Sequence, residues 1–379
     1  MRYLIVILSF FCIFFSCKKT TKEKTTLEIK TLESQKVQKA KGFSIRTYKN
    51  HKEITVYTPW PEAKDSLHYI LYPKGASRPE RNGNFTFIEV PIERVIVTAT
   101  TDIPMLEYLN IEDRLVGFPN TDYISSEKTR QLIDSGKVKN LGNENNLNVE
   151  NVLASDPELV IGFATTPGNK SFDLLKKSEI PVVINSSWLE SHPLGRAEWI
   201  KFVAAFFGKE KEARTIFTRI EKEYTEAASL VKTDNKKPTA ISGNMYKDIW
   251  YLPGGNSFMA QLFEDAQIDY LWSETEKTGS LSLNFENVLE TGQSATLWIG
   301  AGNARSLNGL QNENAKYNLF EAFKNKNVYS SSLKTGKKGG SVYYELGPMR
   351  PDLILKDFIK IAHPEFLTDY ELYFFKKLE

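Results

Sequence analysis

Cysteine is almost absent from this chain of 379 residues, which carries only Cys12 and Cys17. Cys12 lies in an apolar run near the N-terminus and would be lost if that run is removed by processing, and Cys17 follows the run. No disulfide, cysteine metal cluster or thiol nucleophile is then expected in the mature protein. Its stability has to come from apolar burial, and a chain of this length suffices for one or two domains.

Histidine is scarce in the chain, and neither sign of charge is in large excess. The four histidines share no metal-ligand spacing, so we expect no bare-metal site, although single axial ligation of haem needs no spacing. The formal net charge of +2, from 49 basic and 47 acidic residues, argues against a nucleic-acid partner. The motifs of a nucleophile elbow, a phosphate-binding loop and a zinc protease do not occur. These absences argue against an enzyme, and we expect no resident cofactor.

The N-terminus carries the first positive signal. An apolar run, 3–15, follows Arg2 and precedes Ser16 and Cys17. It is shorter than the ~20 residues of a membrane-spanning helix and is typical of a signal peptide. The stretch 14–17 resembles a bacterial lipobox, which implies removal of 1–16 and acylation of Cys17. We therefore expect a periplasmic protein held at a membrane by a lipid anchor; the alternative is an ordinary secretory signal that happens to end in cysteine.

Two segments of different composition follow before residue 91. Residues 17–41 are rich in Lys, Thr and Glu, so we expect a flexible tether. Residues 42–90 alternate apolar and polar side chains between Pro and Gly turns. This pattern predicts a small antiparallel β-rich extension.

Continuous apolar runs alternate with helical patterns in the rest of the chain. Strands are expected at 94–99, 115–118, 158–163, 180–184, 240–241, 296–300 and 327–330, and a closing helix at 351–362. A long helical stretch, 194–232, with a break near Gly208, would separate an N-terminal lobe, 91–193, from a C-terminal lobe, 233–379. The predicted fold is α/β, with two doubly wound α/β lobes joined by one long helix and a small N-terminal β appendage.

One seven-residue pattern occurs once in each lobe. Residues 147–153 and 283–289 are identical at six of seven positions, and each stretch precedes an apolar strand. The asparagine of each suits a helix N-cap, which places Glu150 and Glu286 in a first helical turn. These glutamates either complement the helix dipole or present a pair of carboxylates to arginines of a partner. The repetition favours docking of a partner.

The order and spacing of several motifs resemble a known family. The chain resembles helical-backbone periplasmic substrate-binding proteins, which deliver iron chelates, haem or cobalamin to ABC importers. The resemblance lies in the stretches 94–98, 116–117, 148–150, 156–161, 253–258, 284–286, 347–357 and 363–364. The resemblance covers about 90–368 and implies two lobes bridged by one long helix, with the ligand in the cleft between them. It also implies that Glu150 and Glu286 dock arginines of an ABC importer permease, which works with its ATPase. The segment 42–90 departs from the better-known members, and we expect a monomer.

Ligand contacts are expected in the loops after the strands. Large aromatic side chains there suit a flat macrocycle or an aryl chelate, while a place in the core is the alternative for each of them. Arg350 would either meet a ligand carboxylate or cap the helix that follows it. The predicted ligand is a ferric siderophore, haem or a corrinoid such as cobalamin, and the predicted aromatic contacts are Phe163, Tyr246, Trp250, Tyr343 and Tyr344.

A second class of function stays open at this point. A lipid-anchored hydrolase with an interlobe active site would need two carboxylates to converge within ~5–10 Å. Permease docking instead needs Glu150 and Glu286 to lie apart on an outer surface.

Overall fold

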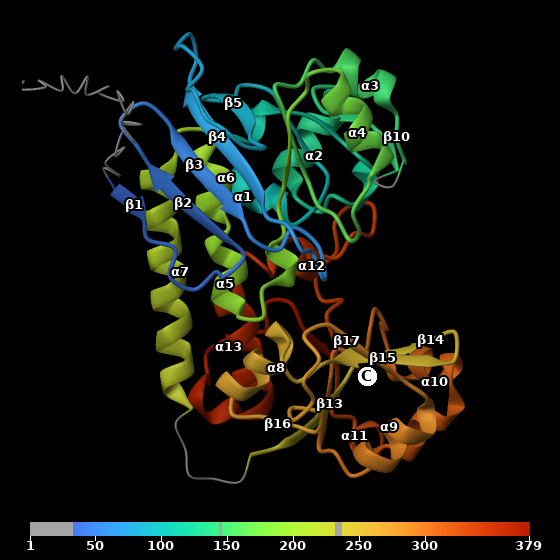
Figure 1. Ribbon diagram of the computed structural model, residues 1–379. Coiled ribbons are helices and arrows are strands. Elements are labelled where there is room, and N and C mark those ends of the chain that lie inside the picture. Colours follow the sequence, from blue (N-terminus) through green and yellow to red (C-terminus); the bar gives the residue numbers. More distant parts are fainter. Residues whose placement is uncertain (1–32, 144–145, 232–236) are drawn as a thin grey trace, which may run out of the picture. The chain divides into compact units, whose positions relative to one another are not determined.

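The computed structural model describes residues 33–143, 146–231 and 237–379, which belong to one compact unit (Figure 1). The predicted signal peptide, Cys17 and the first part of the predicted tether lie outside the described residues. Within them, no helix has both the length and the apolar character needed to cross a membrane.

The N-terminal lobe is built on a five-stranded parallel sheet in the order β12-β11-β6-β7-β8. Its central strands are entirely buried, as the continuous apolar runs predict for strands covered on both faces. The strands are β6 (Val95–Val97), β7 (Leu115–Phe118), β8 (Lys139–Asn140), β11 (Leu159–Gly162) and β12 (Val182–Ile184). The helices are α1 (Asp102–Tyr108), α2 (Glu127–Asp134), α3 (Val149–Ala154) and α4 (Lys170–Lys177), and a short hairpin joins β9 (Gly142–Asn143) to β10 (Asn146–Leu147).

The C-terminal lobe repeats this plan with the sheet order β16-β13-β18-β19-β20, in which only β20 is antiparallel. Its strands are β13 (Thr239–Ser242), β16 (Asp269–Tyr270), β18 (Leu297–Ile299), β19 (Val328–Ser330) and β20 (Lys376–Lys377). The helices are α8 (Phe258–Asp265), α9 (Phe285–Gly292), α10 (Leu307–Glu313), α11 (Glu321–Lys324), α12 (Val342–Leu346) and α13 (Pro351–Ala362). The predicted α/β fold of two lobes is confirmed.

The C-terminal lobe also holds a second, antiparallel sheet that the sequence did not predict. It consists of β14 (Asn244–Tyr246), β15 (Ile249–Pro253) and β17 (Ser280–Leu283). The turn between β14 and β15 is Lys247-Asp248, and both residues have positive φ, at 49° and 63°. Two such residues form the tight turn that matches the twist of a hairpin. A Lys-Asp pair is a weak sequence signal for this turn, which is why the hairpin was missed.

The connection between the lobes consists of three helices instead of one. They are α5 (Pro193–Glu198), α6 (Ile200–Ala205) and α7 (Glu210–Leu230). The chain turns between α6 and α7 at Gly208, whose φ of +67° favours glycine. Only α7 is long, and it packs along α13 (Figure 1).

The N-terminal sheet is part of the body of the protein. Its order is β1-β2-β3-β4-β5, with β1 (Glu33–Gln35), β2 (Phe43–Thr47), β3 (Lys52–Val56), β4 (Leu67–Pro73) and β5 (Thr86–Val90). The prediction of a purely antiparallel sheet is wrong at its edge, because β5 runs parallel to β4 after a crossover. The ring of Phe43 lies 4.6 Å from that of Trp199, and the backbone N–H of Ile184 donates to the Tyr69 hydroxyl at 3.0 Å. The sheet therefore shares one hydrophobic core with the N-terminal lobe.

Two buried carboxylates hold the segment that precedes β2. Glu198 accepts the backbone N–H groups of residues 38–40, at distances down to 2.6 Å, and the Lys201 ammonium at 2.6 Å. Glu190 accepts the backbone N–H groups of residues 41 and 42. The prediction of a flexible tether up to residue 41 is therefore wrong for its last residues. Their polar composition gave no sign of the acceptors, which lie about 150 residues further along the chain.

Candidate functional site

Four neighbouring cavities lie at the carboxyl ends of the parallel strands of both lobes. Their volumes are about 380, 370, 350 and 280 Å³. In each sheet the strand order reverses beside the first strand of the lobe, between β6 and β11 and between β13 and β18. Ligands of α/β sheets bind at such reversal points. The loops that follow these four strands line the cavities, at 98–101, 163–166, 242–243 and 300.

An aromatic side chain from each lobe borders the cavity of about 350 Å³. Phe163 comes from the loop after β11, and Tyr344 comes from α12. Tyr344 is 54% exposed and also lines the cavity of about 380 Å³, while Phe163 also lines the two remaining cavities. The structure thus brings these two predicted contacts together at one cleft.

Tyr343 lies deeper in the same wall. It lines the cavity of about 380 Å³, and its hydroxyl donates to the sulfur of Met259 at 3.1 Å. Its ring packs edge-on against Tyr344, with centroids 5.1 Å apart, and against Phe375. Burial raises the pKa of Tyr343 above its ordinary value, so its hydroxyl stays protonated. Tyr343 therefore holds the ring of Tyr344 in place and also exposes part of its own ring to the cavity.

Arg196 is a cleft cation that sequence reasoning missed. Its guanidinium lies 3.6 Å from the centre of the Phe258 ring and donates to the backbone carbonyls of Trp188 and Glu190, at 2.6 and 3.2 Å. No carboxylate of the described residues lies within ion-pair distance of it. Burial lowers the pKa of Arg196 to about 10, which still leaves it charged at neutral pH. The cavity of about 380 Å³ therefore has in its wall a positive charge that makes no ion pair within the described residues, while the nearby carboxylate of Glu190 favours its charged form.

Trp250 is not available to a ligand. Its side chain is 0% exposed, its indole N–H donates to the Ser242 carbonyl at 2.9 Å, and its ring lies 5.2 Å from that of Trp298. The residue alternates with exposed neighbours along β15 and points into the lobe, so its place is in the core. Tyr246 is 62% exposed near the β14–β15 turn and lines none of the cavities found in the described residues. Neither residue is kept as a ligand contact.

Arg350 has neither of its two predicted roles. Its guanidinium pairs with Asp352 at 2.7 Å and Glu223 at 3.1 Å, and it donates to the Tyr108 hydroxyl at 3.0 Å. It makes no side-chain cap to α13. The side chain ties α1 and α7 to α13, because all its donor groups point to these three partners.

Glu345 joins the two lobes beside the cleft. This residue of α12 is 4% exposed, and its carboxylate accepts the backbone N–H groups of Ser125 and Ser126 at 2.6 and 2.8 Å. The backbone of Gly340 also lies so close to the N-terminal lobe that a Cβ there would be 2.4 Å from the Tyr123 carbonyl oxygen. Burial raises the pKa of Glu345 to about 7, against the effect of the two N–H donors. The sequence gave no signal for this contact between segments about 220 residues apart.

The repeated pattern folds in the same way in each lobe. Asn148 accepts the N–H of Asn151 at the start of α3, and Asn284 accepts that of Asn287 at the start of α9. Glu150 and Glu286 are exposed on these helices, which stand well apart in Figure 1, and neither glutamate lines a cavity found in the described residues. This arrangement does not fit a two-carboxylate active site.

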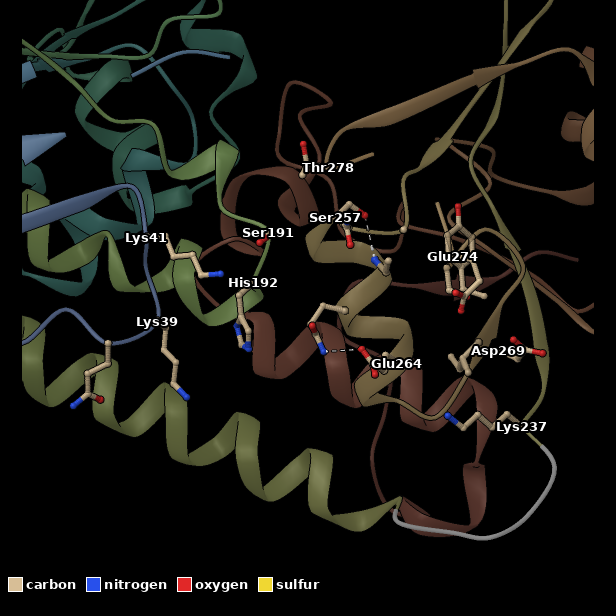
Figure 2. A pocket seen from close by; sticks show the side chains of 18 residues that line it. Lys39, Lys41, Ser191, His192, Lys237, Ser257, Glu264, Asp269, Glu274 and Thr278 are labelled. Atoms are coloured by element: carbon tan, nitrogen blue, oxygen red, sulfur yellow. Dashed lines mark hydrogen bonds between the residues drawn. The ribbon is translucent and has the colours of Figure 1, made fainter. Parts of the chain in front are cut away.

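A fifth cavity, larger than these four, lies elsewhere, between α8 and the segment before β2. Figure 2 shows Lys39, Lys41 and His192 on one side of this space of about 970 Å³, and Glu264 on α8 across from them. Its lining holds one aromatic residue, Tyr270, whose hydroxyl donates to the Pro253 carbonyl. The walls lack the paired aromatic faces of the cleft, and we do not place the ligand there.

Two lobes of this topology, with ligand-sized cavities at their facing strand ends, define a bilobal binding protein. A model described as periplasmic binding protein matches residues 95–332, and the chain belongs to this family. Proteins of this family deliver small molecules to ABC importers, so the protein is a binding protein and not an enzyme.

Similar proteins include an uncharacterized lipoprotein of Methanocaldococcus jannaschii, 28% identical over 304 residues, which are 78% of this chain and 70% of the relative. A second uncharacterized lipoprotein of that organism is 25% identical over 373 residues, which are 91% of this chain and 90% of the relative. A solved structure of a possible iron-binding protein from Staphylococcus epidermidis has a TM-score of 0.56 at 18% identity and covers 72% of this chain and 99% of its own. The haem-binding protein HutB of Vibrio cholerae has a TM-score of 0.55 at 17% identity, covering 69% and 99%. These structures show a shared fold.

Proposed function

We propose that this protein is a lipid-anchored substrate-binding protein that captures a ferric chelate, haem or a corrinoid in the interlobe cleft and delivers it to an ABC importer permease. The observation that carries the proposal is the pair Phe163 and Tyr344, which offer aromatic faces from both lobes to one cavity. Aromatic faces contact a large flat ligand over a wide apolar area with few rotamers to freeze. The printed names of two structural neighbours, one haem-binding and one possibly iron-binding, agree with this class.

The charge of the cleft restricts the class of ligand further. The guanidinium of Arg196, which makes no ion pair within the described residues, favours a ligand with a carboxylate or another anionic group, because a buried cation gains most from an anionic partner. Haem and many ferric chelates carry such groups.

Docking and anchoring are parts of the same proposal. Glu150 and Glu286 would each receive an arginine of the permease, one at each lobe. Cys17 would carry the lipid, as the names of two lipoprotein relatives suggest. The hydrolase alternative is dropped, because the family consists of transport proteins.

The test is a binding screen with matched tyrosine variants. Haem, cyanocobalamin and a panel of ferric siderophores are titrated into the purified protein, and quenching of tryptophan fluorescence is followed. We expect micromolar or tighter binding of at least one, and a loss of ~1–3 kcal/mol in affinity for Tyr344→Ala.

Tyr246→Ala is the control, because Tyr246 is an equally exposed tyrosine of the same lobe outside the cleft. It should leave the affinity unchanged. Equal effects of the two variants would contradict the placement of the site. Binding of a sugar, peptide or bare metal ion in place of any chelate, haem or corrinoid would contradict the ligand class.

A further inference from the structure

Asp102 is a buried carboxyl group with one unused oxygen. The residue is 1% exposed at the start of α1. Its Oδ1 accepts the side-chain amide of Asn185 at 2.5 Å, whereas its Oδ2 has no hydrogen-bond partner among the described residues. Leaving a buried oxygen without a donor is costly, so an unpaired group of this kind calls for an explanation.

Two other buried acids of the same chain, Asp352 and Asp357, are fully paired. Asp352 binds the guanidinium of Arg350, and Asp357 accepts the hydroxyl of Tyr370 and three backbone N–H groups with its two oxygens. Both are 0% exposed. Because the fold provides donors for these acids, the free oxygen of Asp102 is not a general feature of its buried carboxyl groups.

A small chamber lies against this carboxyl group. Its volume is about 280 Å³, and its walls include Asp102, Phe163, Ser187 and Trp188. The indole N–H of Trp188 also lacks a partner in the described part of the chain. Phe163 and Thr101 line both this chamber and the cavity of about 350 Å³, so the chamber lies directly beside the main cleft.

We propose that this chamber is a polar subsite that binds an uncharged arm of the ligand, a hydroxyl or a primary carboxamide. The arm donates to Oδ2 of Asp102 and accepts from the indole N–H of Trp188. An ammonium group would leave the indole N–H unpaired, and a carboxylate would face the carboxyl group of Asp102. The chamber holds a side arm but not a macrocycle, whose body would rest between Phe163 and Tyr344. The inference rests on the proposed function and deepens it.

The test compares the ligand affinities of two variants of the chamber with those of a control variant at another acidic residue. Asp102→Asn keeps the shape and one acceptor for Asn185, but it places an NH₂ group where the free oxygen stands. Trp188→Phe keeps the aromatic wall and removes the donor. Asp113→Asn changes an exposed acid of the same lobe and is the control. Affinities are measured for cyanocobalamin, which has primary carboxamide arms, for ferrioxamine B, which has an ammonium arm, and for haem, whose arms are carboxylates.

We expect each cleft variant to weaken the binding of cyanocobalamin by ~10-fold or more, the range for one lost hydrogen bond to a buried group. Binding of haem should not change. The unfolding temperature of ligand-free Asp102→Asn should stay nearly equal, because one unpaired buried polar group replaces another of the same shape. A fall in unfolding temperature together with affinity would show a structural role and overturn the subsite. Tight binding of cyanocobalamin that neither cleft variant weakens would overturn it too and leave the proposed function intact. Binding of ferrioxamine B, whose arm is an ammonium group, should not change in either variant.

If no probe binds the wild type, the proposed function fails and the subsite is tested alone. The protein is labelled with 5-fluorotryptophan, and the resonance of Trp188 is identified by its loss in Trp188→Phe. Acetamide should shift this resonance saturably in the wild type and in Asp113→Asn, but not in Asp102→Asn. A resonance that acetamide does not move in the wild type overturns the subsite.

Discussion

The two lobes agree in how they begin one helix and differ in what they place at the cleft. The repeated seven-residue pattern gives α3 and α9 the same N-cap and the same exposed glutamate. At the strand ends, by contrast, the N-terminal lobe offers Phe163 and a buried acid, whereas the C-terminal lobe offers two tyrosines on α12. The parallel strands and the starts of α3 and α9 thus repeat in both lobes, while the added sheets and the ligand site do not.

The largest expected effect tests the part that repeats in both lobes. If Glu150 and Glu286 seat the loaded protein on a permease, Glu150→Ala combined with Glu286→Ala should abolish uptake of the ligand in cells. Ligand affinity in solution should not change, because neither side chain lines a cavity of the described cleft. Uptake of the bound ligand and its affinity are measured in parallel.

Glu290→Ala supplies the control, since Glu290 is an exposed glutamate one turn further along α9. It should transport normally. The two single variants sharpen the comparison, because symmetric docking predicts similar losses from either lobe. A double variant that folds but no longer binds ligand would show that the glutamates belong to the pocket.

The next effect separates core aromatics from cleft aromatics in the C-terminal lobe. Trp250→Ala should lower the free energy of unfolding by ~3–5 kcal/mol, because it removes a fully buried ring from a cluster with Trp298 and Phe320. Tyr344→Ala should change it by less than ~1 kcal/mol, since this ring is half exposed. Urea unfolding of both variants checks the difference. A Trp250→Ala protein that is stable but binds ligand poorly would contradict this placement and show that Trp250 is a ligand contact.

The comparison also shows how far sequence reasoning reaches. Periodicity and N-caps are local, so seven strands of the two lobes, α13 and the starts of α3 and α9 were predicted close to their observed bounds. The two-residue strands β8, β16 and β20 are too short to show a periodicity and were not predicted. Whether an aromatic residue faces the core or the cleft depends on the strand that carries it, and Trp250 was misplaced because the β14–β15 hairpin was missed. Arg196, Glu190 and Glu345 act on partners in other elements, and nothing in their neighbouring residues marks them.

The smallest effect concerns the contact that holds the lobes together beside the cleft. Burial raises the pKa of Glu345 from its ordinary 4.5 to about 7, while the N–H groups of Ser125 and Ser126 and the charge of Arg130 oppose this rise and Glu107 adds to it. Between pH 4.5 and about 7 the folded protein therefore keeps a proton that the unfolded chain has lost. The contribution of Glu345 to stability is fully present below this window and falls as the pH rises through it, by up to ~1.4 kcal/mol per pH unit.

Glu345→Gln isolates this contribution from other titrating groups, including Asp102, because the glutamine does not titrate. Free energies of unfolding are measured in urea at several values between pH 4.5 and 7.5 for both proteins. We expect the wild type to lose stability relative to Glu345→Gln as the pH rises. If the wild type instead gains stability relative to the variant, the two N–H donors outweigh burial, and the ionised carboxylate is the form that joins the lobes.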